Sequence, residues 1–173
     1  ITSFGGSAFA DSGLTEITIN NGIREIGESA FANTPLTSIT FPKTITRISG
    51  LGNSNITNIH FAEGAEPTEI AENAFYMCKI TTFDIPASVT KIGTGAFQYS
   101  NIQKITIPEA VTTIERSAFS DSGIQEIVIP ETVTTIGDRC FSACKYLTKV
   151  TLPDNMTQLP FYIFGGCTKL ETI

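Results

Sequence analysis

The dipeptide Ala-Phe returns at a fixed interval along this chain. It occurs at residues 8–9, 30–31, 74–75, 96–97 and 118–119, so successive copies lie 22 residues apart, with one interval twice as long. Cys140-Phe141 and Ile163-Phe164 fill the same place in two later copies. A unit this short cannot bury an apolar face alone, so neighbouring copies must stack. The spacing therefore predicts a solenoid in which residues 1–173 form a single domain of about eight repeats of 22–23 residues.

Each copy contains a segment of the form Leu/Ile-x-x-Ile-x-Ile, which is usually closed by proline. Its last three positions alternate apolar and polar residues and are rich in Ile and Thr, which favours a half-buried strand. Copies joined by a long return path must pair in parallel. These segments cover residues 14–19, 36–41, 56–61, 80–85, 102–107, 124–129 and 147–152, with a shortened copy at 170–173.

A second segment, of the form Val/Ile-Thr-x-Ile-Gly, follows each strand. A column of β-branched residues at one register indicates a second ladder on the opposite side. The Ala-Phe segment is too brief for a free helix and is predicted to form a short helical or 3₁₀ turn. The column consists of Thr2, Thr46, Thr68, Thr90, Thr112, Thr134 and Thr157, with Arg24 as its one exception.

One copy is irregular. After Ile48 the chain reads Ser-Gly-Leu-Gly-Asn-Ser-Asn, which is two residues short and lacks Ala-Phe. We expect Leu51 to occupy the missing phenylalanine position. The next connection, residues 62–69, is two residues longer than its counterparts and carries Glu63, Glu66 and Glu69.

Charge and hydropathy exclude two classes of partner. The chain carries a net charge of −6 with 11 Lys and Arg, and no block of basic residues supplies the footprint of a nucleic-acid-binding protein. Its apolar runs fall far short of the roughly 20 residues of a membrane span. The chain begins at Ile1 and stops at Ile173 inside repeats. We expect it to be a piece of a longer protein, packed against flanking repeats of the same chain.

The four cysteines do not form a disulfide framework. Cys78, Cys144 and Cys167 each lie three residues after the repeat's phenylalanine, where other copies carry Ser or Thr. Such a position favours a small, inward side chain with a weak hydrogen bond, so we predict buried free thiols. One disulfide among Cys140, Cys144 and Cys167 is the alternative. No CxxC pair or His partner suggests a metal site.

The consensus Ala-Phe-x-x-Cys/Ser-x-Leu/Ile-x-x-Ile-x-Ile-Pro-x-x-Val-Thr-x-Ile-Gly resembles the BspA-like leucine-rich repeats, a class of bacterial and protist surface proteins. The resemblance covers essentially the whole chain, apart from the irregular copy around Asn53 and residues 159–164. It implies a mainly β, right-handed leucine-rich-repeat superhelix with a parallel concave sheet. It also implies an exported or cell-surface protein that binds other proteins, sometimes in adhesion. The family offers no catalytic motif and no cofactor site.

Solvent-facing strand positions are the candidate binding residues. In Leu-x-x-Ile-x-Ile these are the third and fifth residues, because successive side chains point to opposite faces. We predict that a protein or glycan partner contacts the middle of this face. The candidate contact residues are His60, Asp84, Lys104, Glu126, Asn58 and Lys149.

Other patterns allow different interpretations. Ser38, His60 and Asp84 on adjacent strands could suggest a hydrolase, but a flat sheet offers no pocket or oxyanion donors; a surface pair between His60 and Asp84 is expected instead. Glu63, Glu66, Glu69 and Glu72 form a solvated acidic connection or, as the alternative, a Ca²⁺ site. Phe161 and Tyr162 are expected to be partly exposed.

The sequence as a whole predicts a non-enzymatic extracellular or cell-surface domain that mediates protein or glycan binding. A structural spacer that holds another domain away from the cell is the alternative. A carbohydrate-active enzyme on a β-solenoid is a third possibility, although no carboxylate and basic cluster supports it. Threonine columns also occur in ice-binding surfaces, but Arg24 interrupts this one.

Overall fold

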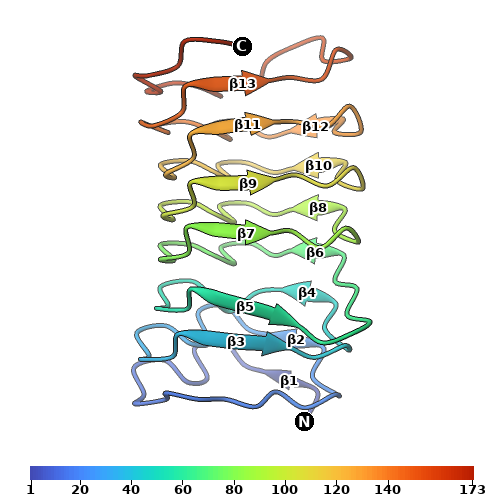
Figure 1. Cartoon of the computed structure of the whole chain (residues 1–173), viewed down its shortest axis with the longest axis vertical. Coiled ribbons are helices and arrows are strands. Elements are labelled where there is room, and N and C mark those ends of the chain that lie inside the picture. The colour runs from blue at the N-terminus through green and yellow to red at the C-terminus, as the bar shows by residue number, and fades with distance from the viewer.

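The chain forms a single stack of β-turns and short strands. The computed structural model describes residues 1–173 and contains no helix, so no helical segment could cross a membrane. Thirteen strands, all paired in parallel, lie across the stack, and the two termini lie at its opposite ends (Figure 1). The architecture is the predicted leucine-rich-repeat solenoid.

The Leu-x-x-Ile-x-Ile segments form the ladder nearest the viewer in Figure 1. Side chains at its third and fifth positions are exposed and define what we call the sheet face, while the residue between them points into the core. The strands pair two by two, as β3–β5, β7–β9 and β11–β13. Their bounds are β3 (Ser38–Phe41), β5 (Asn58–Phe61), β7 (Thr82–Asp84), β9 (Lys104–Thr106), β11 (Glu126–Val128) and β13 (Lys149–Thr151).

The predicted second ladder is confirmed on the opposite side. Five of its strands form one continuous sheet in the order β12-β10-β8-β6-β4, and β1 pairs with β2. The threonine column reinforces it, since the Thr90 hydroxyl, like its amide, donates to the carbonyl of Thr68 one copy earlier. The strands are β1 (Ser3–Phe4), β2 (Glu25–Ile26), β4 (Arg47–Ile48), β6 (Glu69–Ile70), β8 (Lys91–Ile92), β10 (Thr113–Ile114) and β12 (Thr135–Ile136).

The Ala-Phe segments fold as successive turns, not as the expected helical or 3₁₀ turns. Every second amide leaves the segment to reach the next copy: the Phe97 amide donates to the Ala118 carbonyl at 2.7 Å, and the Tyr99 amide to the Ser120 carbonyl at 3.0 Å. Only the amides between them, such as that of Gln98, bond three residues back. A 3₁₀ helix needs every amide bonded internally, so stacking replaces the helix with a third ladder, which we call the turn face.

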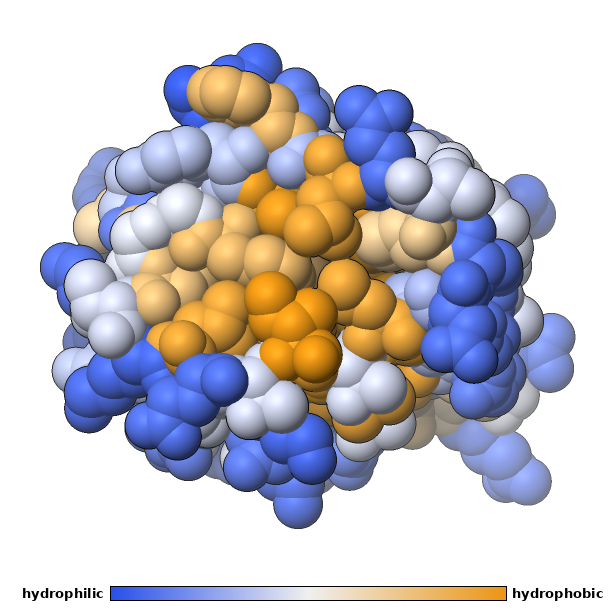
Figure 2. All heavy atoms as spheres, turned by 90° about the horizontal axis from the view of Figure 1, so that it is seen from above, coloured by the Kyte–Doolittle hydropathy of each residue, from blue (hydrophilic) through white to orange (hydrophobic).

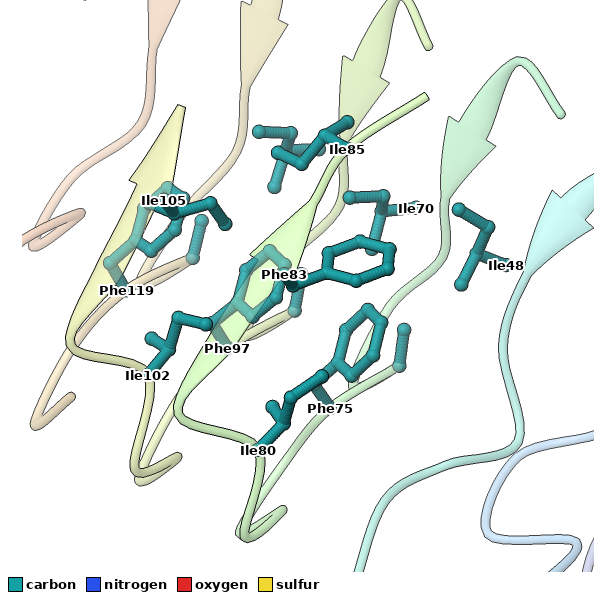
Figure 3. Close-up of a cluster of buried hydrophobic side chains, with 14 of the residues drawn as sticks. Ile48, Ile70, Phe75, Ile80, Phe83, Ile85, Phe97, Ile102, Ile105 and Phe119 are labelled. Atoms are coloured by element: carbon teal, nitrogen blue, oxygen red, sulfur yellow. The ribbon is translucent and has the colours of Figure 1, made fainter. Parts of the chain in front are cut away.

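The core is a stack of aromatic rings flanked by isoleucines. The rings of Phe75 and Phe97 are 4.7 Å apart at 4°, and Phe119 continues the column at 5.1 Å from Phe97. Isoleucines such as Ile70 and Ile102 lie on either side of the rings (Figure 3). Viewed along the stack, apolar atoms occupy the centre and hydrophilic residues form the rim (Figure 2). The recurring Phe and Ile positions therefore point inward and form one core.

Leu51 occupies the phenylalanine position of the irregular copy, as predicted, and is fully buried. Ile59 lies 11 positions after Ile48, whereas in the next copy Phe83 lies 13 positions after Ile70; we call this segment between the two ladders the arm. The shorter arm brings β5 against β3, and no backbone hydrogen bond joins β5 to β7. The visibly wider spacing between β5 and β7 in Figure 1 follows from this shift.

The first expected strand, residues 14–19, is not formed. Its apolar residues Leu14, Ile17 and Ile19 still pack against the core, but no backbone hydrogen bond joins this segment to β3. At the other end, the shortened copy contributes a single bridge between Lys149 and Thr172.

Candidate binding surfaces

The sheet face presents the candidate residues as predicted. Asn58 and His60 of β5, Lys104 of β9, Glu126 of β11 and Lys149 of β13 are all exposed. Asp84 is exposed at the end of β7. In the paired strands their spacing is fixed by backbone registers such as Glu126 with Lys149, so the side chains project from a rigid base.

A cleft of about 290 Å³ separates β5 from β7. His60 and Asp84 line it from opposite walls, and Ile59 and Phe61 are only partly buried beside it. The expected His60–Asp84 pair is wrong, because no ion pair within 4.0 Å joins the two residues. The reason is the shortened arm, which moves β5 toward β3. His60 instead lies beside Thr40, its register partner.

A second cleft, of about 400 Å³, lies between β9 and β11. Lys104 and Glu126 are on its two walls, and the exposed Val128 replaces the Thr or charged residue of other copies. Neither Lys104 nor Glu126 takes part in an ion pair within 4.0 Å. These charges are therefore not neutralised within the chain.

The acidic connection does not act as one group. Glu69 turns onto the second ladder, where its carboxylate meets Arg47 Nε at 3.0 Å and Lys91 Nζ at 3.5 Å. Its cations come from neighbouring copies, which the sequence of the connection alone does not reveal. No three His, Cys, Asp or Glu side chains gather in a way that would hold a metal ion. The geometry therefore gives no support to the Ca²⁺ alternative.

Lys91 extends the same network to Glu115, with an Nζ–Oε1 distance of 2.9 Å. The hydrogen bond from Lys91 lowers the pKa of Glu115, and the Thr94 amide and hydroxyl add two further donors. The same contact raises the pKa of Lys91. Four charged side chains thus connect β4, β6, β8 and the residue after β10 along the second ladder.

All four cysteines are free thiols, as predicted, and the disulfide alternative is not formed. The Cys144 and Cys167 thiols each donate to a phenylalanine carbonyl of the preceding copy, at 3.0 Å. Burial raises the pKa of the Cys140 thiol. The neighbouring Cys144 side chain lowers the pKa of the half-buried Cys167 to about 7, while the pKa of Cys144 itself is raised by the same contact.

Sequence reasoning missed a groove on the turn face. It measures about 580 Å³ and crosses four consecutive copies. Phe161 and Tyr162 are exposed as expected, and Tyr162 lies at one end of this groove. The Arg139 guanidinium lies 5.6 Å from the centre of the Phe161 ring. The groove residues recur at positions one to three residues before or after the repeat's phenylalanine, and the stacking of copies brings them together. They are Thr94, Gln98, Tyr99, Arg116, Ser117, Ser120, Asp121, Arg139, Ser142, Ala143 and Tyr162.

Solved structures of bacterial leucine-rich repeat proteins share this fold. A Bacteroides ovatus protein aligns with 97% of this chain at 26% identity and a TM-score of 0.61, and one from Eubacterium ventriosum with 100% at 26% and 0.59. A leucine-rich cell surface protein of Faecalibacterium prausnitzii aligns with 100% at 22% and 0.54. This chain spans 38%, 57% and 64% of their respective lengths.

A comparison with curated proteins gives no match. The family model described as "BspA type Leucine rich repeat region" matches six copies, over residues 1–100 and 68–173, which together cover the whole sequence. The three ladders, the phenylalanine column and this match lead to one conclusion. The chain belongs to the BspA-type leucine-rich repeat family.

Proposed function

We propose that this domain is a non-enzymatic binding module of a bacterial surface protein and that it holds an extracellular protein against its sheet face. One observation carries the proposal: the exposed strand positions form columns of varied charge, held in register within each strand pair, and no ion pair within 4.0 Å joins these charges. Side chains held on a rigid base lose little entropy when a partner binds. The His60, Asp84, Lys104 and Glu126 side chains are the proposed centre of the contact.

The two clefts support this location. They lie between strands that are not paired along their length, at β5–β7 and β9–β11, and each places charged side chains around partly apolar walls. Val128, at 64% exposure, offers an apolar contact that packing within the chain does not use. Neighbouring strands lie ~4.8 Å apart, so six strands present roughly 25 Å of surface, enough for a protein-sized contact.

A pair of variants tests the proposal against a partner isolated from host extracellular proteins. Replacing His60, Asp84, Lys104 and Glu126 with Ser should raise the Kd at least tenfold, or ~1.4 kcal/mol, with little change in melting temperature. The control replaces Thr90, Thr112 and Thr134 of the second ladder with Ser. If the control set alone abolishes binding in a folded protein, the partner uses the other face.

Surface location needs its own test. Intact cells that produce the protein should lose it when a protease is added outside, and a cytoplasmic marker should survive the same treatment. Protection of this domain in intact cells would contradict the proposed location.

A further inference from the structure

The turn-face groove carries two cations without acidic partners. Arg116 and Arg139 come from adjacent copies, are exposed, and make no ion pair within 4.0 Å. The neighbouring acids are engaged elsewhere: Asp138 accepts the Phe161 amide at 2.9 Å, and Glu115 binds Lys91. Asp121 is the one carboxylate that lines the groove, and it accepts a hydrogen bond from Ser120 at 3.1 Å. The charged lining residues Arg116, Arg139 and Asp121 thus carry a net charge of +1 in a chain whose net charge is −6.

Hydroxyl groups form the floor of the groove. Ser120 and Ser142 are buried, and their hydroxyl oxygens are 2.9 Å apart. Because Ser120 donates to Asp121, Ser142 is the donor in this pair. Ser117 and Thr94 add two further hydroxyls at the walls. The groove thus offers several hydrogen-bonding groups close to the two guanidinium groups.

Two tyrosines lie toward the ends of the groove, and the backbone beneath them is unfavourable. Tyr99 and Tyr162 have φ angles of 56° and 54°, and Arg139 has a φ of 57°. Most other copies place Ser, Asn, Asp or Gly at the same turn positions, with Met77 and Ala143 as exceptions, and Asn and Asp in particular tolerate this left-handed conformation. Tyr99 and Tyr162 are 48% and 57% exposed, so burial within the chain compensates little for the strain. Tyr99 meets the Tyr76 ring edge-to-face at 5.7 Å and Tyr162 lies 5.9 Å from the Phe161 ring, so each tyrosine has one aromatic neighbour. A ligand stacked on the exposed part of the rings would add a further contact.

We infer that this groove is a binding site for a short anionic oligosaccharide that bears carboxylate or sulfate groups. Guanidinium groups match such oxyanions with paired hydrogen bonds. Tyrosine rings pack against the apolar face of a sugar while their hydroxyls remain available for hydrogen bonds. The serine and threonine hydroxyls and Asp121 then meet sugar hydroxyls. From Tyr99 to Tyr162 the groove crosses three copy-to-copy steps of ~4.8 Å, which gives ~14 Å, a length suited to an extended chain of sugars.

Isothermal titration calorimetry on the whole chain tests the inference with four probes. These are a chondroitin sulfate tetrasaccharide, a hyaluronan tetrasaccharide with carboxylates alone, neutral cellotetraose and hexaglutamate. At least one anionic sugar should bind at least tenfold more tightly than both cellotetraose and hexaglutamate. The two anionic sugars distinguish sulfate from carboxylate recognition. If no probe binds, or if hexaglutamate matches the sugars, the assignment to an anionic oligosaccharide is overturned.

Two groove variants locate the site. Arg116→Gln with Arg139→Gln should weaken binding at least tenfold, whereas Arg24→Gln, at an exposed arginine of the second ladder, should not. Tyr99→Asn with Tyr162→Asn should weaken binding at least fivefold while leaving the melting temperature unchanged or higher, because Asn relieves the backbone strain. Full affinity in the arginine variant, or equal loss in Arg24→Gln, rules out this groove. The Ser variant of the sheet face should retain the sugar, which separates this site from the proposed protein contact.

Discussion

The regular copies and the irregular copy fill the same column of the core with different side chains. From Phe75 to Phe141 the rings stack at 4.7–5.3 Å and nearly parallel, and each is fully buried. The irregular copy places Leu51 in this column, also fully buried, and the turn-face ladder continues through it from Phe31 to Ala74. The ladder thus accepts another apolar residue in the aromatic position, provided the side chain points inward.

The two arms of the irregular copy also differ in length from those of the regular copies, by opposite amounts. The irregular copy loses two residues before β5 and gains two after it, so Ile48 and Ile70 remain 22 residues apart, like Ile70 and Ile92. The second ladder therefore passes through the irregular copy unbroken, whereas the sheet-face ladder is interrupted beside β5. A change in the length of one arm opens a cleft on one face without disturbing the opposite face.

The largest expected effect concerns the aromatic column. Phe119→Ala should lower the free energy of unfolding by about 3–5 kcal/mol, because it opens a cavity between Phe97 and Phe141. Phe119→Leu introduces the residue type that Leu51 supplies in the irregular copy. This variant should lower the free energy of unfolding by less, about 1–2 kcal/mol. Urea unfolding followed by circular dichroism measures both variants. Equal losses would mean that leucine cannot replace the ring in a regular copy, so that the aromatic stack itself is required there.

The second prediction concerns the backbone of the irregular copy. Gly50 has a φ of +84°, and an added Cβ would lie 2.4 Å from Ile26 Cγ2. Gly50→Ala should therefore cost about 2–4 kcal/mol through strain and overpacking. Gly64 is the matched control, since its φ is +77° but nothing lies within 4 Å of the added atom. Gly64→Ala should cost only about 1–2 kcal/mol in thermal unfolding, and a larger loss there would point to strain alone.

Much of the fold follows from spacing, because each copy contributes identical apolar positions to one core. Two of the three ladders, the Leu51 substitution and the exposed strand columns could all be inferred this way. Pairing between strands could not, since the break beside β5 depends on how two arms of different length are accommodated. The His60–Asp84 pair was wrong for that reason. The short helix was wrong because amides of the Ala-Phe segment bond to the next copy.

The two candidate binding surfaces also differ in how far the sequence predicts them. The sheet face was predictable because strand alternation alone exposes its residues. The turn-face groove was not predicted, because the side chains at its lining positions, one to three residues from the repeat's phenylalanine, vary from copy to copy. Their proximity arises from stacking and from left-handed turns, which recur in every copy and so do not mark the copies that form the groove. A useful signal would have been bulky residues at turn positions that elsewhere hold Ser, Asn or Asp.

A smaller effect is expected from the ion pairs of the second ladder, which cross the irregular copy at Glu69. Glu115→Gln should cost about 0.5 kcal/mol at neutral pH, a small value because these side chains are partly exposed and screened by solvent. The folded-state pKa of Glu115 is lowered, so its stabilising effect is present above the ordinary glutamate pKa and disappears as the pH falls through the lowered value.

Unfolding curves at several pH values measure the difference between Glu115→Gln and the unmodified chain. The difference should vanish in acid and shrink in high salt. Glu109→Gln, at an exposed residue outside these ion pairs, serves as the control. A penalty that persists at low pH would show that the loss comes from packing and not from charge.

The smallest effect on stability is expected at the small inward position three residues after the phenylalanine. The irregular copy makes the same hydrogen bond here as a regular copy. Ser54 donates to the Leu51 carbonyl at 2.7 Å, and Ser100 donates to the Phe97 carbonyl. Cys167→Ser should therefore change the unfolding free energy by no more than about 0.5 kcal/mol.

The reactivity of Cys167 should nevertheless differ from that of the other thiols. Alkylation follows the thiolate fraction and exposure, so Cys167 should react with iodoacetamide with a midpoint at about pH 7, while the buried Cys140 stays unmodified in the folded protein. Mass spectrometry of peptides from samples labelled over a pH series resolves the two sites. Cys144→Ala removes the side chain that stabilises the thiolate and should move the midpoint toward the ordinary value of about 8.5. An unchanged midpoint in that variant would contradict the role of Cys144.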